Sequence, residues 1–282
     1  MQEIRLFLER VLVVIVVYRR ALENSPTWNS LSVELTRLQS NMSIFVYDNS
    51  PGPQSIPLCD FIDGYYHHDS SNAGVSTAYN HGNQMAVQLK KEWLLLLDQD
   101  TQLTRGALVQ YYEAFEANPS NILFAPILVD HSGILSPFRY RRGGGTRIGA
   151  MPETNMPIRK YRVINSGILV KCSAFNEVGG YEASLPLDFS DISFLEKLRA
   201  VTKNIIVVRT SCRHEFSGSS KMNMVESRDR FTAYVRGAYS FSKLAGNPFW
   251  LLIRTLGRAS KLTVRYRSIA FLVIHYRTWY HR

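Results

Sequence analysis

The chain has 282 residues, of which 45% are hydrophobic and 20% charged, and its net charge is +10. This length suits one large α/β domain with an appendage or two small domains, and the composition excludes wholesale disorder. The charge is unevenly distributed: residues 1–220 hold 21 basic and 21 acidic side chains, whereas residues 221–282 hold 12 basic and two acidic ones. We therefore expect a neutral domain over residues 1–220 and a basic extension over residues 221–282 that meets a polyanionic surface.

The N-terminal segment and the cysteines indicate the cellular compartment. Residues 11–17 (VLVVIVV) are apolar but too few to span a membrane, and Tyr-Arg-Arg follows them where a signal peptide would have small residues. We interpret this run as a buried strand. Cys59, Cys172 and Cys212 are far apart and form no C-x-x-C pair, which favours reduced thiols in a cytoplasmic protein over disulfides or a zinc site.

The first hundred residues alternate between strand and helix patterns. Strands are predicted at 11–17, 43–47, 65–68 and 93–97, and helices at 26–39 and 76–90. This alternation indicates an α/β protein with a doubly wound, mostly parallel sheet flanked by helices. Ligands of such sheets bind at the carboxyl ends of the strands. Three polar clusters fall there, namely Tyr18-Arg19, Asp48-Asn49 and Asp98-Gln99-Asp100.

The second part of the chain is less regular. Strands are predicted at 123–129, 163–171 and 205–208, and helices at 174–179 and 191–201. Residues 131–161 contain three consecutive glycines and three prolines, which favours a long mobile loop or a lid. From about residue 225 the pattern is helical and basic.

Asp98 and Asp100 follow four leucines at the end of a predicted strand. Two carboxylates in this arrangement can converge on one hard cation such as Mg²⁺, which is typically bound by one or two carboxylates and substrate phosphates. A solvated turn is the alternative for this D-x-D pair. Asp48, at the end of a neighbouring strand, suits a contact to a base or ribose, or an Asx-turn.

The order of six motifs resembles family 2 glycosyltransferases with the GT-A fold, and most of all their bacterial rhamnosyltransferase-like branch. The resemblance covers residues 10–220, and the order of the motifs makes it specific. These motifs are Asp48-Asn49-Ser50, Asn72-Ala73-Gly74 with Asn80-His81-Gly82, WLLLLDQD at 93–100, Asn165-Ser166-Gly167, GGYEASLPLDFSDISFLEKLR at 179–199, and His214. The resemblance implies inverting sugar transfer from a nucleoside-diphosphate sugar with a divalent cation.

The resemblance also implies roles for single residues. Asp191 would be the catalytic base, with Asp188 as the alternative because Ser193 stands where the family has a further acid. Taken alone, Asp191 could instead cap the helix predicted at 191–201. Asp100 and His214, with Asp98, would bind the metal, and a histidine ligand fits Mn²⁺ better than Mg²⁺. The nucleotide-sugar contacts would come from Tyr18, Asp48, Asn72, Gly74, Asn80, Asp98 and Gln99.

Other polar groups allow two interpretations. Asn165 and Ser166, together with Asp188 and Arg141, could bind the donor or acceptor sugar. For Asn165 and Ser166 a β-bulge or turn is the alternative. Arg141, with Arg139 and Arg142, could clamp the diphosphate when the loop closes, or belong to a solvated basic loop. His67 and His68 form no metal pair, because adjacent strand residues face opposite sides.

The basic extension has a helical arrangement of charge. Arg254, Arg258, Lys261 and Arg265 share one helical face with apolar residues between them, which is typical of helices in an anionic headgroup layer. A charged outer face on ordinary packed helices is the alternative. No nucleic-acid-binding motif is present, so we expect no nucleic-acid partner.

Together these features predict a metal-dependent, inverting glycosyltransferase on the inner face of the cell membrane. The donor would be a dTDP- or UDP-sugar, with L-rhamnose from dTDP-rhamnose first, and the acceptor a lipid-linked glycan in bacterial surface polysaccharide (O-antigen) synthesis. The alternatives are a UDP-hexose or UDP-N-acetylhexosamine transferase, a metal-dependent nucleotide hydrolase, and a non-catalytic carbohydrate- or membrane-binding module.

Overall fold

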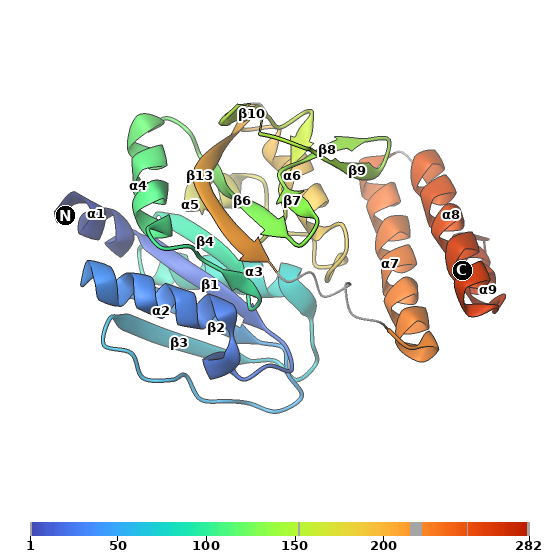
Figure 1. Ribbon diagram of the computed structural model, residues 1–282, viewed down its shortest axis with the longest axis horizontal. Helices are drawn as coiled ribbons and strands as arrows, with labels where there is room; N and C mark the ends of the chain where they lie inside the picture. The colour runs from blue at the N-terminus through green and yellow to red at the C-terminus, as the bar shows by residue number, and fades with distance from the viewer. Residues whose placement is uncertain (1, 152, 215–221, 247, 281–282) are drawn as a thin grey trace.

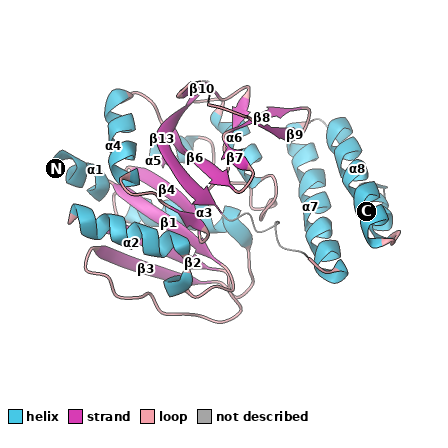
Figure 2. Ribbon diagram, in the orientation of Figure 1, coloured by secondary structure: helices cyan, strands magenta, loops and turns pink. Residues whose placement is uncertain are grey.

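The computed structural model describes residues 2–151, 153–214, 222–246 and 248–280. A ten-stranded sheet has the order β10-β13-β6-β12-β4-β1-β2-β3, with β5 paired to β13 and β7 to β6. Helices cover both faces of this sheet (Figures 1 and 2). The prediction of an α/β protein with a mostly parallel sheet flanked by helices is confirmed.

The N-terminal half supplies the parallel core of the sheet. Its elements are α1 (Gln2–Glu9), β1 (Val11–Val17), α2 (Pro26–Leu38), β2 (Met42–Asp48), β3 (Ile62–His68), α3 (Gly74–Gln88) and β4 (Trp93–Asp98), with a 3₁₀ turn at Leu22–Asn24. β1 pairs in parallel with β2 and with β4, and all its residues are buried because helices cover both faces. Each strand and helix predicted here is present, whereas α1 was not predicted.

The second half adds strands of both directions. It contains β5 (Thr101–Gln102), α4 (Ala107–Ala117), β6 (Leu123–Asp130), β12 (Ile168–Lys171), α5 (Cys172–Glu177), α6 (Ser190–Leu198) and β13 (Asn204–His214). β12 runs antiparallel between β4 and β6. Only the last four residues of the strand predicted at 163–171 are strand, and the strand predicted at 205–208 continues to His214 past a register shift. α4 was not predicted.

Residues 131–161 are predicted to form a long mobile loop or a lid, and the structure contradicts the loop because about half of this stretch is strand. The chain forms β7 (Gly133–Ser136), β8 (Phe138–Arg141), β9 (Gly144–Arg147), β10 (Asn155–Pro157) and β11 (Tyr161–Arg162) there. β11, β8 and β9 form a second, antiparallel sheet with β8 in the centre. Strands of two to four residues are too short to show a readable alternation, and their glycines and prolines resemble a loop.

Two hydrophobic clusters lie on opposite faces of the central sheet. One joins alternate residues of β1 to α1, α2 and α4, and the other joins the intervening residues to α3, α5 and α6. Because successive strand residues face opposite sides, β1 contributes Val13 and Ile15 to the first cluster and Leu12 and Val14 to the second. The three cysteines are free thiols.

The C-terminal extension is helical, as predicted. It consists of α7 (Met224–Ala245), α8 (Pro248–Tyr266) and α9 (Ala270–Tyr280), which lie beside the α/β domain (Figure 1). The three helices pack around Phe231 and Phe271. Leu185 and Phe189, just before α6, pack against Phe241 and so attach the helices to the α/β domain. The predicted boundary at 220/221 lies outside the described residues. Within the described part of the chain, no helix is long and apolar enough to cross a membrane.

Candidate active site

A cleft of about 1080 Å³ opens at the carboxyl ends of β1 and β4. The starts of α3 and α6, the β8–β9 hairpin, α7 and α8 complete its walls. Ten of the residues singled out in the sequence line it: Tyr18, Asn72, Gly74, Asp98, Gln99, Asp100, Asn165, Asp188, Asp191 and His214. The fold therefore brings together side chains that lie as much as 196 positions apart in the sequence.

Asp98, Asp100 and His214 form one cluster in this cleft. Their possible ligand atoms all lie within 4.8 Å of one another. His214 Nδ1 is 3.5 Å from Asp100 Oδ1 and 2.8 Å from Thr101 Oγ1. The contact with Thr101 fixes the orientation of the imidazole, which is the usual support of a metal-binding histidine.

This cluster is suited to a divalent cation. Asp100 Oδ1 is buried and accepts no hydrogen bond from the described residues, so one carboxylate oxygen is left for a ligand. Burial, and then the charge of Asp98, raise the pKa of Asp100, so a cation bound beside the two carboxylates would stabilise their charged forms. Two carboxylates and an imidazole fit Mn²⁺, and with water and phosphate oxygens also Mg²⁺.

Polar neighbours fix Asp98. Its Oδ1 accepts a hydrogen bond of 2.7 Å from the hydroxyl of Tyr79 on α3, and its backbone N–H donates to Ser166 Oγ at 2.9 Å. Ser166 Oγ also lies 2.6 Å from Thr101 Oγ1, and so continues the chain of hydrogen bonds to His214. Ser166 is fully buried and does not line the cleft, so in this structure it supports the acidic pair.

Asp191 lies in the first turn of α6, at the wall of the same cleft. The N-cap residue of α6 is Phe189, and Asp191 accepts its hydrogen bond from the adjacent Ile192 N–H at 2.7 Å, so it is no ordinary helix cap. Burial raises the pKa of Asp191 to about 7, and the charges of Asp188 and Asp98 act in the same direction. A carboxylate with such a pKa can accept a proton at neutral pH.

Asp188 is held in an ion pair and differs in this from Asp191. Arg230 on α7 donates from Nη2 to Asp188 Oδ1 at 2.8 Å and from Nη1 to Oδ2. A bidentate guanidinium partner stabilises the carboxylate and occupies both of its oxygens. Of the two candidate bases, Asp191 is therefore the one that is available to take up a proton.

Four further predicted residues, Tyr18, Asn72, Gly74 and Gln99, line the cleft. Gln99 exchanges two hydrogen bonds with the backbone of Tyr18, of 2.9 and 3.2 Å, and so ties the end of β1 to the end of β4. Asn72 is exposed in the left-handed region with a φ of 54°. Gly74 has a φ of 88°, and a Cβ there would lie 2.2 Å from the carbonyl oxygen of Pro186, so only glycine fits.

Two predicted nucleotide-binding residues do not line this cleft. Asp48 is fully buried, and its carboxylate accepts hydrogen bonds from Ser50 N–H, the Gln54 amide and the Tyr66 hydroxyl. These contacts fix the turn after β2, as in the alternative interpretation of Asp48 as an Asx-turn. Asn80 uses its amide to bind the backbone N–H and C=O of Tyr181, so it joins α3 to the segment before α6.

The arginines predicted to clamp a diphosphate point elsewhere. Arg139, Arg141 and Arg142 are exposed and do not line the cleft, and Arg142 stacks on Trp250 at 4.8 Å. The arginines that do line it are Arg147, Arg230 and Arg254. Sequence patterns missed them because their approach to the cleft depends on how α7, α8 and the hairpin pack. The one available signal was Gly143-Gly144-Gly145, which allows a close approach of another segment.

Other predicted features have plain structural roles. His67 and His68 face opposite sides of β3, as predicted: the His67 ring lies 5.2 Å from that of His81, and His68 Nε2 is 2.8 Å from the carbonyl oxygen of Ser50. Asn165 lines the cleft but is already bonded to Ser190 Oγ and the Tyr181 hydroxyl. Tyr79, Thr101, Tyr140 and Tyr234 were not anticipated as residues of the site.

No family model and no curated protein matches this chain. Among solved structures, the crystal structure of S. aureus TarS, a glycosyltransferase, aligns with a TM-score of 0.55 and 12% identity over 94% of this chain and 52% of that chain. The structure of S. aureus TarS 1–349 in complex with UDP aligns with a TM-score of 0.51 and 12% identity, over 95% of this chain and 90% of that chain. The structure of S. aureus TarS 1–349 in complex with UDP-GlcNAc aligns with a TM-score of 0.50 and 12% identity, over 81% of this chain and 66% of that chain.

This likeness defines the fold. The curled, mostly parallel sheet flanked by helices is a GT-A-like glycosyltransferase fold, which confirms the fold that the sequence motifs implied. The chain spans about half the length of the full TarS chain, 52%. At 12% identity the comparison extends to the fold alone.

Proposed function

We propose that this protein is an inverting glycosyltransferase that moves a sugar from a nucleoside diphosphate to an acceptor hydroxyl. One observation carries the proposal: a proton-accepting carboxylate with a pKa of about 7, Asp191, and a cluster of three cation ligands line the same cleft. The GT-A-like fold supports it. A separated base and a cation site are what a single displacement at a sugar carbon with a diphosphate leaving group requires.

Asp191 would act as the general base. The acceptor hydroxyl gives its proton to the Asp191 carboxylate as its oxygen attacks C1 of the donor sugar, and the C1–phosphate bond breaks on the opposite side. The configuration at C1 is inverted because the displacement is single and in line. The Ile192 N–H, which donates to Asp191 Oδ1, leaves Oδ2 to face the acceptor.

Asp98, Asp100 and His214 would hold Mn²⁺ or Mg²⁺. When bound, such a cation neutralises charge that develops on the leaving diphosphate. The chain itself keeps the ligands in register through Tyr79, which holds Asp98, and Thr101, which holds His214. The cation and Asp191 would then act on opposite partners of the reaction, the leaving group and the acceptor.

Tyr18, Asn72, Gly74 and Gln99 would contact the nucleotide sugar. The motifs resemble the rhamnosyltransferase-like branch, which favours dTDP-rhamnose as donor. The structural neighbour binds UDP and UDP-GlcNAc, which favours a UDP-N-acetylhexosamine instead. Calorimetry with dTDP-rhamnose, UDP-GlcNAc and UDP-glucose, each with Mn²⁺, separates the two: the true donor should bind at least tenfold more tightly, and equal weak binding of all three would contradict both.

A transfer assay separates this function from the alternatives. We expect donor consumption that requires both a divalent cation and an acceptor, with an inverted anomeric product. Donor loss at the same rate without any acceptor would identify a nucleotide hydrolase. Binding of nucleotide sugars without turnover under any condition would favour a non-catalytic module.

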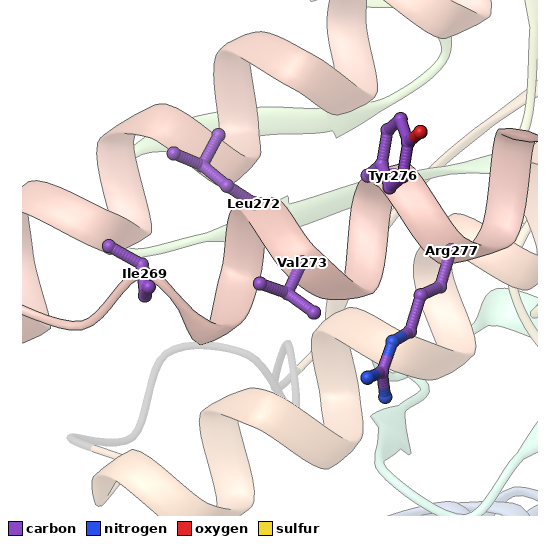
Figure 3. Close-up of a pocket in the computed structure, with 5 residues that line it drawn as sticks. All are labelled: Ile269, Leu272, Val273, Tyr276 and Arg277. Carbon is purple, nitrogen blue, oxygen red and sulfur yellow. The ribbon is translucent and has the colours of Figure 1, made fainter.

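The C-terminal helices would bring the cleft to an anionic membrane. α8 carries an exposed apolar stripe of Phe249, Ile253, Leu256 and Val264 on the side opposite its buried stripe. Another exposed apolar stripe is formed by Ile269, just before α9, and by Val273, Tyr276 and Tyr280 on α9. Figure 3 shows a hollow beside this second stripe, lined by Ile269, Leu272, Val273, Tyr276 and Arg277. Exposed apolar residues beside the basic excess of residues 221–282 suit an anionic headgroup layer.

A pair of matched variants tests the membrane surface. Val264 on α8 and Val33 on α2 have 78% and 66% exposed side chains. Val264→Asp should weaken binding to vesicles of phosphatidylglycerol and phosphatidylcholine several-fold, because it puts a carboxylate into the proposed contact, whereas Val33→Asp should not. Equal affinities of the two variants in a vesicle sedimentation assay would refute this surface and leave the enzymatic proposal intact.

A further inference from the structure

The three arginines in the cleft differ in what they bind. Arg147 pairs with Asp130 through two hydrogen bonds, and Arg230 pairs with Asp188 in the same way. Arg254, on α8, forms no ion pair with a carboxylate of the described residues, and its hydrogen bonds go to the backbone carbonyl oxygens of Arg142 and Arg141. It is therefore the cleft arginine whose charge is not neutralised by the protein.

The β8–β9 hairpin holds the guanidinium of Arg254 in place. Its Nε donates to the carbonyl oxygen of Arg142 at 2.8 Å, and its Nη2 points at that of Arg141 at 3.4 Å. A Cβ on Gly144 would lie 2.1 Å from its Cζ, so the glycine makes room for the guanidinium. These contacts hold the group in one orientation and leave Nη1 without a partner among the described residues. A guanidinium fixed in this way is prepared to bind an oxyanion.

Arg254 belongs to the base side of the cleft. Tyr140, on β8, lies close enough to Asp191 and to Arg254 for both charges to act on its pKa. Tyr234, on α7, is in the field of Arg254 and also carries the Arg258 guanidinium over its ring at 4.1 Å. With Phe138, these tyrosines line the cleft beside Arg254. Aromatic rings with fixed cations are suited to a sugar ring that carries negative charge.

We propose that Arg254 binds an oxyanion of the acceptor, so that this protein selects acceptors with a phosphate or a carboxylate close to the reacting hydroxyl. The inference rests on the proposed function, because it assigns the Asp191 side of the cleft to the acceptor. Phosphate of a lipid-linked or phosphorylated sugar and carboxylate of an acidic sugar are two sources of the same chemistry. The donor diphosphate would have its own positive partner in a cation held by Asp98, Asp100 and His214.

The test uses the full chain saturated with Mg²⁺ and with UDP or dTDP, whichever nucleotide it binds more tightly. Binding of glucose 1-phosphate, glucuronate and methyl glucoside is measured by calorimetry for the wild type, Arg254→Gln, Arg254→Lys and the control Arg236→Gln, an exposed α7 arginine outside the cleft. The wild type and the control should bind at least one charged probe about tenfold more tightly than methyl glucoside, as expected for a charge-assisted hydrogen bond. Arg254→Gln should abolish this preference and Arg254→Lys should retain part of it.

The outcomes separate this inference from the proposed function. Preference for glucose 1-phosphate identifies the phosphate source, and preference for glucuronate the carboxylate source. Two results would overturn the role of Arg254 in acceptor binding. One is a wild type that binds the charged probes no more tightly than methyl glucoside, and the other is an Arg254→Gln protein that loses affinity for the nucleotide but keeps the preference for charged probes. Failure of every variant, including the wild type, to bind either UDP or dTDP would instead overturn the proposed function.

Discussion

Replacement of Asp191 by asparagine should abolish transfer and, above neutral pH, make the folded protein more stable. The carboxyl has a pKa of about 7 in the fold against 3.8 normally, mainly because burial disfavours its charge. The folded state therefore binds a proton that the unfolded state has lost between these two values. The stabilisation from that proton is complete below a pH of about 3.8 and is lost as the pH rises through about 7.

The magnitude follows from the difference between the two pKa values. A carboxyl pKa of about 7 in place of 3.8 corresponds to an upper bound of about 4 kcal/mol at high pH. Because Asp191 is partly exposed to the cleft, solvent screening reduces this figure, and we expect about 1–2 kcal/mol. Asparagine carries no charge at any pH, so Asp191→Asn should match the wild type near pH 4 and exceed its stability by that amount at pH 8.

Two assays check this reasoning. Denaturant unfolding from pH 4 to 9 gives the stability, and initial transfer rates give the activity, which should rise with pH through about 7 in the wild type and fall 10²–10⁴-fold in Asp191→Asn. Asp188→Asn is the matched control: it leaves Arg230 unpaired and should lower stability by about 1–3 kcal/mol. Undiminished turnover of Asp191→Asn would remove it as the base, and a stability difference independent of pH would contradict the buried charge.

Three further predictions concern the cation cluster, the hairpin and the acidic pair. Chelation of the divalent cation should stop transfer. Asp100→Asn should weaken Mn²⁺ binding more than tenfold in calorimetry, because the substitution removes a carboxylate whose Oδ1 accepts no hydrogen bond from the described residues. An unchanged Mn²⁺ affinity would exclude a role for Asp100. Gly144→Ala should displace the Arg254 guanidinium, which is the flexible end of a side chain, and should therefore reduce the preference for charged probes at a cost below about 1 kcal/mol in thermal unfolding. Gly149→Ala, which faces open space, should keep the preference, and equal preferences of the two variants would contradict the position assigned to Arg254. Tyr79→Phe removes the hydrogen bond to Asp98 and should weaken Mn²⁺ binding by a smaller factor than Asp100→Asn does. The same calorimetry measures both affinities, and a larger loss of Mn²⁺ affinity in Tyr79→Phe would indicate a disturbed fold.

The sequence by itself determined the core of the fold and much of the site. Strands buried on both faces must be apolar at every position, so residues 11–17 and 93–97 were recognisable without tertiary information. Asp98 and Asp100 follow the second of these runs directly, and the carboxyl ends of parallel strands meet at one edge of a sheet. The sheet, its helices and the acidic end of the cleft therefore followed from local patterns.

Only the tertiary structure decided which polar groups are free. Asp48 and Asp191 both stood in family-like motifs, but hydrogen bonds from Ser50, Gln54 and Tyr66 occupy the first, whereas burial in the cleft wall leaves the second able to accept a proton. Such differences arise from neighbours in space.

The basic extension shows the same limit. Its positive charge was countable, and the helical spacing of Arg254, Arg258, Lys261 and Arg265 suggested a single outward surface. In the fold, Leu251 is buried at the start of that face, Arg258 lies on Tyr234, and Arg254 reaches the cleft. Helical periodicity fixes which residues share a face of a helix, but only the packing of that helix against a hairpin more than 100 residues earlier fixes what the face contacts.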